Sequence, residues 1–337
     1  MKRIVWVPIE PLEERYSANW ARWYPKEFKD ARVPFIEIMP APLSDKIRDG
    51  AFLDVCGTNY FKAMQIAELC KMAYNKELTD NDVIFLGDVW FPGLEALAYI
   101  RDCLKMKFKI VGCLFAGTYD PNDFLTKNGV GYWGKHQEEA WFRIIDKFFM
   151  ATKDHCRMVR DTRDIDPKKL IVTGHPVYYA EDRNTIEKEN IVVFPHRLNE
   201  EKNPDMFTAL KFVLQDIYPN WEFLFTKKET TTKQEYFDLL ERAKISVSYA
   251  DQETYGFAMV ESIAARCFPV VPDILCYKEM YHPVFRFKSF NESVVLVKSL
   301  IEKPIDFYEV MLENRKRLLD DAASAIPKMI HECMNWD

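Results

Sequence analysis

Short apolar segments recur along the chain, and longer segments between them repeat apolar residues every three or four positions. The short segments are apolar nearly throughout rather than alternating with polar residues, which is typical of parallel strands covered on both faces. We predict strands at residues 3–9, 33–39, 82–89, 107–115, 147–153, 169–175, 190–197, 221–227, 244–250 and 267–273.

The segments between these strands have a helical period. In residues 57–76, Phe61, Met64, Ile66 and Leu69 recur at helical spacing, and a helix capped by threonine carries Tyr236 and Leu239 on one face. Strand alternating with helix predicts an open α/β sheet, and the length of the pattern predicts two of them.

We therefore predict two Rossmann-like domains facing each other across a cleft. The first covers 1–180, and the second covers 181–310. A C-terminal helix at 311–337 can cross back to the first domain, and the polar stretch at 178–190 serves as the linker. Ligands of such sheets bind beyond the carboxyl ends of the strands, so the chemistry is sought there.

Composition and charge narrow the class of protein. The chain has 337 residues, 48% of them hydrophobic and 29% charged, with a net charge of −6. Residues 1–180 carry 26 Lys and Arg against 25 Asp and Glu, whereas residues 181–337 carry 20 against 27. No overall basic field attracts nucleic acid, so such binding would need a local patch.

The chain shows no sign of a membrane span or a secretion signal. Its apolar runs are strand-sized, and "MKRIVWVPIEP" has too short an apolar segment for a signal peptide. The eight cysteines form no CxxC pair, which indicates reduced thiols. We predict a cytoplasmic protein.

Two conspicuous motifs predict little. "GVGYWG" at 129–134 matches G-x-G-x-x-G but does not follow directly on a strand, so we interpret it as a glycine-rich loop rather than a dinucleotide site. "DID" at 164–166 lies in a polar turn and is interpreted as solvated surface. Histidines and cysteines lack metal-ligand spacing, so neither a metal nor a cofactor is predicted.

Two cations follow the first strand of the second half. Arg197 comes directly after this strand, and Lys202 precedes a helix that begins near Pro204. A bidentate arginine, a lysine and free backbone N–H groups at a helix start suit a diphosphate, although a pair of solvated loop charges is the alternative.

The stretch "DQETYGFAMVESIAARCFPVV" at 251–271 contains two glutamates, which could be an acid/base pair. The loop 251–256 leads into a helix near Phe257, whose first backbone amides form another anion cradle. Glu261 lies one turn inside this helix among apolar neighbours, where a carboxylate can accept hydrogen bonds from two ribose hydroxyls; Glu253, in the loop, lies nearer the sugar. The predicted donor-binding residues are Arg197, Lys202, Glu253, Thr254, Tyr255, Gly256, Phe257, Ala258 and Glu261.

The second half of the chain resembles the donor domain of retaining GT-B glycosyltransferases of family four. The resemblance rests on Arg197, Lys202, Glu253-x7-Glu261 and "FPVV". Residues 190–282 are similar to the C-terminal domain of tRNA-queuosine mannosyltransferases, and "PLEERYSANW" followed by "WYP" resembles phage glycosyltransferases of modified DNA bases. The chain departs from the pattern before "PVV", where Arg266-Cys267-Phe268 replaces the usual glycine. It also lacks the glycine-rich loop after the first strand and the histidine after the strand at 109–115.

The resemblance implies the GT-B fold, with an acceptor-binding domain at 1–180 and a nucleotide-sugar-binding domain at 181–310. It also implies metal-independent transfer of a hexose, with retention, from a nucleotide sugar such as UDP-glucose or GDP-mannose. A phage-encoded protein of this kind would act in the host cytoplasm. Arg197, Lys202 and Glu253 would be the catalytic residues. The implied acceptor is a hydroxyl on a modified base, with phage-type DNA favoured over queuosine tRNA. A glycan, lipid or small-molecule acceptor and a non-catalytic nucleotide-sugar-binding protein stay open. The candidate acceptor-binding residues are Glu13, Arg15, Tyr16, Asp88, Trp90, Gly117, Thr118, Tyr119 and Asp120, and dense aromatic residues there suit stacking on a sugar or base.

Overall fold

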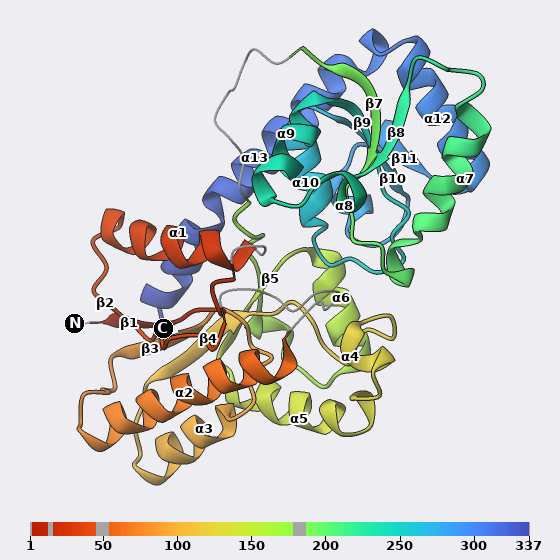
Figure 1. The fold of residues 1–337 in the computed structure, drawn as a ribbon. Helices are drawn as coiled ribbons and strands as arrows, with labels where there is room; N and C mark the ends of the chain where they lie inside the picture. Colours follow the sequence, from red (N-terminus) through yellow and green to blue (C-terminus); the bar gives the residue numbers. More distant parts are fainter. Residues whose placement is uncertain (1, 13–15, 45–53, 178–186, 337) are drawn as a thin grey trace. The chain divides into compact units, whose positions relative to one another are not determined.

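The structure of the protein is a computed structural model that describes residues 2–12, 16–44, 54–177 and 187–336. It divides the chain into two compact units (Figure 1). Unit 1 consists of Met1–Ala151, His155–Pro176 and Ser324–Asp337, and unit 2 consists of Thr152–Asp154 and Val177–Ala323. Most of the predicted linker, at 178–186, lies outside the described residues.

Unit 1 contains a six-stranded sheet in the order β2-β1-β3-β4-β5-β6, and every neighbouring pair is parallel. Its strands are β1 (Arg3–Val7), β2 (Phe35–Glu37), β3 (Asp82–Leu86), β4 (Lys109–Cys113), β5 (Lys147–Met150) and β6 (Leu170–Val172). Its helices are α1 (Tyr16–Asp30), α2 (Val55–Tyr74), α3 (Leu94–Cys103), α4 (Phe124–Lys127), α5 (Gly131–Ile144), α6 (Lys153–Thr162), which starts in unit 2, the short 3₁₀ helix η1 (Pro167–Lys169), and the end of α13 (Ile305–Met334).

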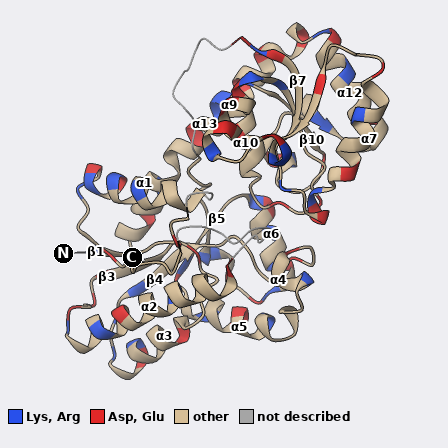
Figure 2. Cartoon of the chain, viewed as in Figure 1, with Lys and Arg blue, Asp and Glu red and all other residues tan. Residues whose placement is uncertain are grey.

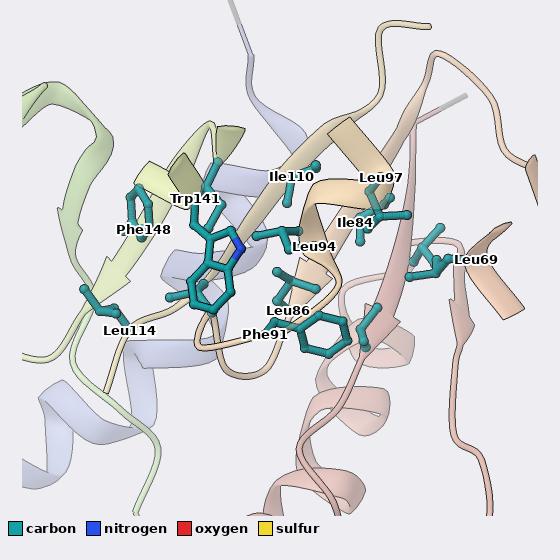
Figure 3. Packing of buried hydrophobic residues seen from close by; sticks show 14 of the residues in the cluster. Leu69, Ile84, Leu86, Phe91, Leu94, Leu97, Ile110, Leu114, Trp141 and Phe148 are labelled. Atoms are coloured by element: carbon teal, nitrogen blue, oxygen red, sulfur yellow. The ribbon is translucent and has the colours of Figure 1, made fainter. Parts of the chain in front are cut away.

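Helices cover both faces of this sheet, which explains why its strands are apolar throughout. On one face, Val5 and Val7 of β1 belong to a buried cluster with side chains from α2, α3 and α5 (Figure 3). On the other face, the ring of Trp6 stacks on Tyr24 of α1 at 4.4 Å, and the Tyr24 hydroxyl lies 3.2 Å from Met329 Sδ of α13. Neighbouring residues of one strand thus face two different helical layers.

Unit 2 contains a five-stranded parallel sheet in the order β11-β10-β9-β7-β8. Its strands are β7 (Glu189–Phe194), β8 (Glu222–Phe225), β9 (Ala243–Val247), β10 (Phe268–Pro272) and β11 (Arg286–Phe287). Its helices are η2 (Glu200–Lys202), α7 (Pro204–Leu214), α8 (Thr226–Glu229), α9 (Lys233–Arg242), α10 (Phe257–Ala264), α11 (Tyr277–Met280), η3 (Pro283–Phe285), α12 (Phe290–Glu302) and the first part of α13.

The sheet of unit 2 is also covered on both faces. Ile191 and Val193 of β7 are buried in one cluster with Leu239 and Leu240 of α9. The ring of Phe194, the next residue after Val193, packs against Phe207 of α7, with 5.4 Å between the ring centroids. The predicted class, two parallel-sheet α/β units, is therefore confirmed.

Each of the ten predicted strand segments overlaps an observed strand. The prediction missed β11, because its two residues are too few to show a pattern. The helix predicted at 57–76 is observed as α2, in which Phe61 and Leu69 are buried and Met64 is 42% exposed. The predicted glycine-rich loop at 129–134 is not a loop throughout, because α5 begins at Gly131.

Candidate functional site

The first part of the candidate site follows β7 in unit 2. Arg197 lies three residues beyond the strand, and Lys202 lies in η2, which ends at Asn203 in the left-handed conformation (φ 53°). The side-chain amide of Asn203 donates to the carbonyl oxygen of Tyr249 at 2.9 Å and to Asp251 Oδ2 at 2.7 Å. Because β7 and β9 are neighbours in the sheet, these bonds join the loops at two adjacent strand ends.

Lys202 forms a buried ion pair with Glu253. The lysine is 4% exposed, and its Nζ lies 3.0 Å from Glu253 Oε1 and 2.5 Å from the carbonyl oxygen of Gln252. Burial alone would raise the pKa of Glu253, but Lys202, His196 and Arg197 together outweigh burial and hold that pKa below its ordinary value. The glutamate is therefore ionised near neutral pH, and an anionic ligand would have to share Lys202 with it.

Arg197 is the more exposed of the two cations. Its side chain is 34% exposed, and the guanidinium Nη2 lies 3.6 Å from Glu201 Oε1. A guanidinium that is partly exposed at a strand end can make bidentate hydrogen bonds to phosphate.

His196, which the sequence analysis did not select, is a buried partner in this site. Its Nε2 lies 2.8 Å from Ser248 Oγ, which in turn lies 3.0 Å from the Tyr277 hydroxyl. Its Nδ1 lies 3.7 Å from Glu253 Oε1. Burial lowers the pKa of His196 to about 3, so the imidazole is neutral at neutral pH. Its position directly before Arg197 was the signal that could have identified it.

The start of α10 has the geometry predicted for it, since the helix begins at Phe257. Gly256 caps it in the left-handed region (φ 74°), and a Cβ there would lie 2.9 Å from the ring of Tyr277. Glycine is therefore required by both conformation and space. Glu253 Oε2 accepts from the Gly256 N–H at 3.1 Å, and Tyr255 is buried with its ring 5.0 Å from that of Phe257.

The remaining predicted donor-binding residues lie on either side of this helix start. The carbonyl oxygen of Thr254 accepts from Thr152 Oγ1 at 3.1 Å. Ala258 follows Phe257 in the first turn of α10, where the helix dipole favours an anion.

Glu261 lies one turn into α10 and is 7% exposed. Its Oε2 accepts from the Tyr236 hydroxyl at 2.7 Å, and its Oε1 lies 3.1 Å from Lys233 Nζ. Both partners come from α9, whose predicted threonine cap is confirmed because Thr232 and Glu235 form a capping box. Tyr236 was predicted only as part of an apolar helix face, and Lys233 was not among the predicted site residues.

This edge of unit 2 thus combines two cations, a helix start and two ionisable carboxylates on loops that follow neighbouring strands. Lys and Arg are otherwise interspersed with Asp and Glu over both units (Figure 2). Such a combination suits a ligand that carries both an anionic group and hydroxyl groups.

The candidate acceptor residues belong to unit 1. Glu13 and Arg15 lie outside the described residues. The ring of Tyr16 packs against Trp20 and Phe115, with centroids 4.8 and 5.7 Å apart. Tyr16 therefore contributes to an aromatic cluster rather than standing alone.

Asp88 and Trp90 follow β3. Asp88 Oδ2 lies 2.9 Å from Lys62 Nζ, and Asp88 Oδ1 accepts from the backbone N–H of Trp90 at 3.1 Å. The ring of Trp90 lies edge-on to Trp141 at 4.8 Å and 6.2 Å from Trp133, which is 44% exposed. Trp133 is the part of this aromatic group that solvent reaches most.

Thr118 belongs to a buried ionic cluster after β4. Glu138 accepts from the Thr118 N–H at 2.5 Å and from its hydroxyl at 2.9 Å, and Arg163 donates to Glu138 Oε2 at 2.8 Å. Burial raises the pKa of Glu138, and the bonds from Thr118 and Arg163 oppose that rise.

The other three candidates after β4 are also held internally. A Cβ on Gly117 would lie 2.0 Å from the ring of Tyr119, so only glycine fits there. Tyr119 is buried, and its hydroxyl lies 2.7 Å from His155 Nε2. Asp120 accepts from the Asn122 N–H at 2.8 Å. The polar groups after β4 therefore brace their own loop.

Asp166 of the "DID" motif caps η1 by accepting from the Lys168 N–H, which agrees with a polar turn.

Within the described ranges, no three His, Cys, Asp or Glu side chains come together in a way that could bind a metal ion. Every described helix is too short or too polar to cross a membrane. The eight cysteines are free thiols, of which Cys56 and Cys103 are exposed.

Comparison with known proteins finds curated relatives and similar solved structures. A tRNA-queuosine alpha-mannosyltransferase of Drosophila melanogaster is 28% identical over 179 residues, covering 42% of this chain and 46% of that protein. The chain thus spans about half the length of this relative. No family model matches the chain.

Among solved structures, sucrose-phosphate synthase from Thermosynechococcus elongatus is similar with a TM-score of 0.70 and 10% identity, and 98% of each chain is covered. A TarM variant from S. aureus, solved with fondaparinux, alpha-GlcNAc-glycerol and UDP, has a TM-score of 0.60 and 13% identity over 82% of this chain and 59% of that chain. The lipopolysaccharide outer core galactosyltransferase WaaB has a TM-score of 0.62 and 8% identity over 99% of each chain. Together with the two parallel sheets, these similarities show that the chain has the GT-B fold.

Proposed function

We propose that this protein is a retaining glycosyltransferase that moves a hexose from a nucleotide sugar to a hydroxyl group. The observation that supports this most is the convergence of Arg197, Lys202 and the start of α10 at the ends of neighbouring strands β7 and β9. Glu253 and Glu261 accompany them as hydrogen-bond acceptors for the hydroxyl groups of a sugar and a ribose.

The chemistry follows from where charge develops. As the bond between the sugar C1 and the phosphate oxygen breaks, the leaving diphosphate gains negative charge and C1 acquires oxocarbenium character. Arg197, Lys202 and the helix start stabilise that charge more strongly in the transition state than in the bound donor. The acceptor oxygen forms the new bond to C1 on the same face, and its proton passes to the leaving phosphate.

This scheme assigns Glu253 to binding rather than proton transfer. Its carboxylate is tied to Lys202 and to the Gly256 N–H, and its pKa is held below the ordinary value. A carboxylate with a lowered pKa is a weak base but a good acceptor for sugar hydroxyl groups. The same reasoning disfavours Glu253 and Glu261 as an acid/base pair, because Glu261 is bonded to Tyr236 and Lys233 instead.

The proposed acceptor is a modified base of nucleic acid. The name of the Drosophila relative supports tRNA, whereas the N-terminal resemblance supports phage-type DNA carrying hydroxymethylpyrimidine, which stays our first choice. Exposed Trp133 beside Trp90 offers an aromatic face for an unstacked base. A glycan, lipid or small molecule is the second candidate class of acceptor, since unit 1 has no large excess of basic residues.

A transfer assay with labelled donors tests this proposal. Radiolabelled UDP-glucose and GDP-mannose are each incubated with hydroxymethylated DNA, the same DNA unmodified, queuosine tRNA, the same tRNA with guanosine, and simple glycans. We expect label only in a modified nucleic acid, equally with and without EDTA, and an α-linked product by NMR.

The controls separate the donor proposal from the acceptor proposal. Arg197→Ala should lower transfer by about 10²–10³-fold, the size expected for one lost transition-state donor. Label in glycans alone would reject the nucleic-acid acceptor but keep glycosyl transfer. Tight donor binding with neither transfer nor donor hydrolysis would instead indicate a non-catalytic nucleotide-sugar-binding protein.

A further inference from the structure

Glu261 is held by two side chains that reach it from another helix. The Tyr236 hydroxyl donates to Oε2 at 2.7 Å, and Lys233 Nζ lies 3.1 Å from Oε1. One partner therefore occupies each carboxylate oxygen. Since a buried carboxylate can rotate about its last bond unless both oxygens are held, this pair fixes its orientation.

The position of Lys233 is not explained by the needs of its own helix. It is the first residue of α9, where the helix dipole disfavours a cation. Its ammonium lies 4.5 Å from the ring centroid of Tyr236 and 4.7 Å from that of Phe237, so both aromatic rings support it next to Glu261. The side chain is 32% exposed, which places the ion pair at the boundary between buried protein and solvent.

Tyr236 is suited to be a permanent donor in this group. Burial raises the pKa of its hydroxyl well above the ordinary value, and the neighbouring Glu261 raises it further. The hydroxyl therefore stays protonated across the working pH range and donates to the carboxylate throughout.

The remaining hydrogen-bonding capacity of Glu261 matches a vicinal diol. A carboxylate has about four acceptor positions, and Tyr236 and Lys233 fill one on each oxygen. One position stays on each oxygen, so two adjacent hydroxyl groups can donate at once, one to each. A sugar with only one of these hydroxyl groups leaves one position unfilled.

We propose that Tyr236 and Lys233 are positioning residues that orient Glu261 to read the 2′,3′-diol of the donor's ribose, so that the site discriminates ribonucleotides from 2′-deoxyribonucleotides. This inference rests on the proposed function, because it takes the nucleotide sugar as the ligand of the site. It adds a selectivity that depends on α9 rather than on α10, where Glu261 itself lies.

Calorimetric titration with four nucleotides tests the inference. UDP, GDP, 2′-deoxy-UDP and 2′-deoxy-GDP are titrated into the wild type, Tyr236→Phe and Lys233→Met. We expect the wild type to bind the better ribonucleotide about 10- to 100-fold more tightly than its 2′-deoxy form, the range for one hydrogen bond to a charged group. Tyr236→Phe should weaken ribonucleotide binding by about tenfold and reduce the ribo/deoxy ratio by a similar factor.

Tyr218→Phe is the matched control. The Tyr218 hydroxyl donates to Glu302 Oε1 at 2.5 Å, so this variant removes the same kind of bond elsewhere in unit 2 and should leave the ratio unchanged. Thermal melting identifies any variant that does not fold, in which case Lys233→Met, at a partly exposed side chain, carries the test. A full ribo/deoxy ratio in a folded Tyr236→Phe or Lys233→Met protein would overturn the inference alone. A wild type that binds no nucleotide would overturn the proposed function and the inference with it.

Discussion

The two units carry similar charged groups at the carboxyl ends of their strands but connect them differently. In unit 1, Arg163, Glu138 and Thr118 form a closed cluster in which the arginine side chain is only 5% exposed. In unit 2, the side chain of Arg197 is 34% exposed. Arg163 follows α6 and donates to Thr118 in the loop after β4, whereas Arg197 lies three residues beyond β7 and is more accessible.

The difference shows why fold alone does not locate a binding site. Buried ion pairs are costly to break, so the cluster around Arg163 favours one loop conformation over others. The corresponding edge of unit 2 has a partly exposed cation and a helix start next to a buried pair, an arrangement that an incoming anion can join. We therefore expect mutations at the two edges to separate stability from binding.

The largest effects should come from exchanging the two arginines for uncharged residues. Arg163→Met leaves Glu138 buried without its cation, so the free energy of unfolding of unit 1 should fall by about 3–5 kcal/mol. Arg197→Ala should change the free energy of unfolding of unit 2 by about 0.5 kcal/mol or less. Glycosyl transfer by this variant should fall by about 10²–10³-fold.

Urea denaturation and nucleotide titration of both variants check this separation. Arg163→Met that still folds should keep the wild-type affinity for UDP or GDP, because the candidate donor site lies in unit 2. The comparison fails if Arg197→Ala destabilises the protein as strongly as Arg163→Met.

A smaller effect of opposite sign in the two units should appear with pH. His196 in unit 2 has its pKa lowered from 6.5 to about 3, so the stability that it contributes is complete above pH 6.5 and is lost as pH falls towards 3. Asp123 in unit 1 has its pKa raised from 3.8 to about 7 by burial, so its contribution is complete below pH 3.8 and is lost as pH rises towards 7.

Two substitutions isolate these contributions. His196→Gln should remove about 2 kcal/mol of the wild type's loss of stability between pH 7 and pH 5. Asp123→Asn, which keeps a capping oxygen for the Leu125 N–H, should be more stable than the wild type by about 4 kcal/mol at pH 8 and by about 0.5 kcal/mol at pH 4. Urea midpoints of both variants and the wild type are measured from pH 4 to pH 8. The stability of His196→Gln relative to the wild type should increase as pH falls, and that of Asp123→Asn should increase as pH rises. Relative stabilities that change in the same direction with pH would contradict the assignment.

The smallest effect should be equal in the two units. Each has a long charged residue in the left-handed region after a helix, Lys105 (φ 56°) after α3 and Arg266 (φ 64°) after α10. Glycine relieves the steric strain that a Cβ causes in the left-handed region, which stabilises the folded state. Glycine also increases the conformational entropy of the unfolded chain, which offsets part of this gain. Lys105→Gly and Arg266→Gly should therefore each stabilise the protein by about 0.5–1 kcal/mol. Thermal melting checks this, and a loss of stability at Arg266 alone would show that its side chain makes a contact that matters more than the backbone.

Much of the fold could be predicted because buried parallel strands are apolar on both faces. Trp6 and its neighbours Val5 and Val7 show the reason, since they face different helical layers and all must be apolar. The helix starts at Pro204 and Phe257 were also predictable from local signals, whereas β11 was too short to leave one.

The residues of the candidate donor site were predictable, but their partners were not. The order of the site residues along the sequence, after β7 and after β9, was recognisable: Arg197, Lys202, Glu253 and Glu261. Tyr236 precedes Glu261 by 25 residues and His196 precedes Ser248 by 52, and no local pattern shows that they touch. Arg266 illustrates the opposite case, because it keeps the left-handed backbone of the glycine expected there without being glycine.

The long helix α13 has a consequence for the order in which the protein is made. Residues up to Ala323 belong to unit 2, and from Ser324 the same helix belongs to unit 1. There, Met329 packs beneath Tyr24, and Glu332 forms an ion pair of 2.6 Å with Lys147. A ribosome therefore synthesises all of unit 2 before it supplies the last helical piece of unit 1. The first unit to emerge is the last to be completed, and until then it exposes the apolar surface that this piece covers to chaperones and to aggregation.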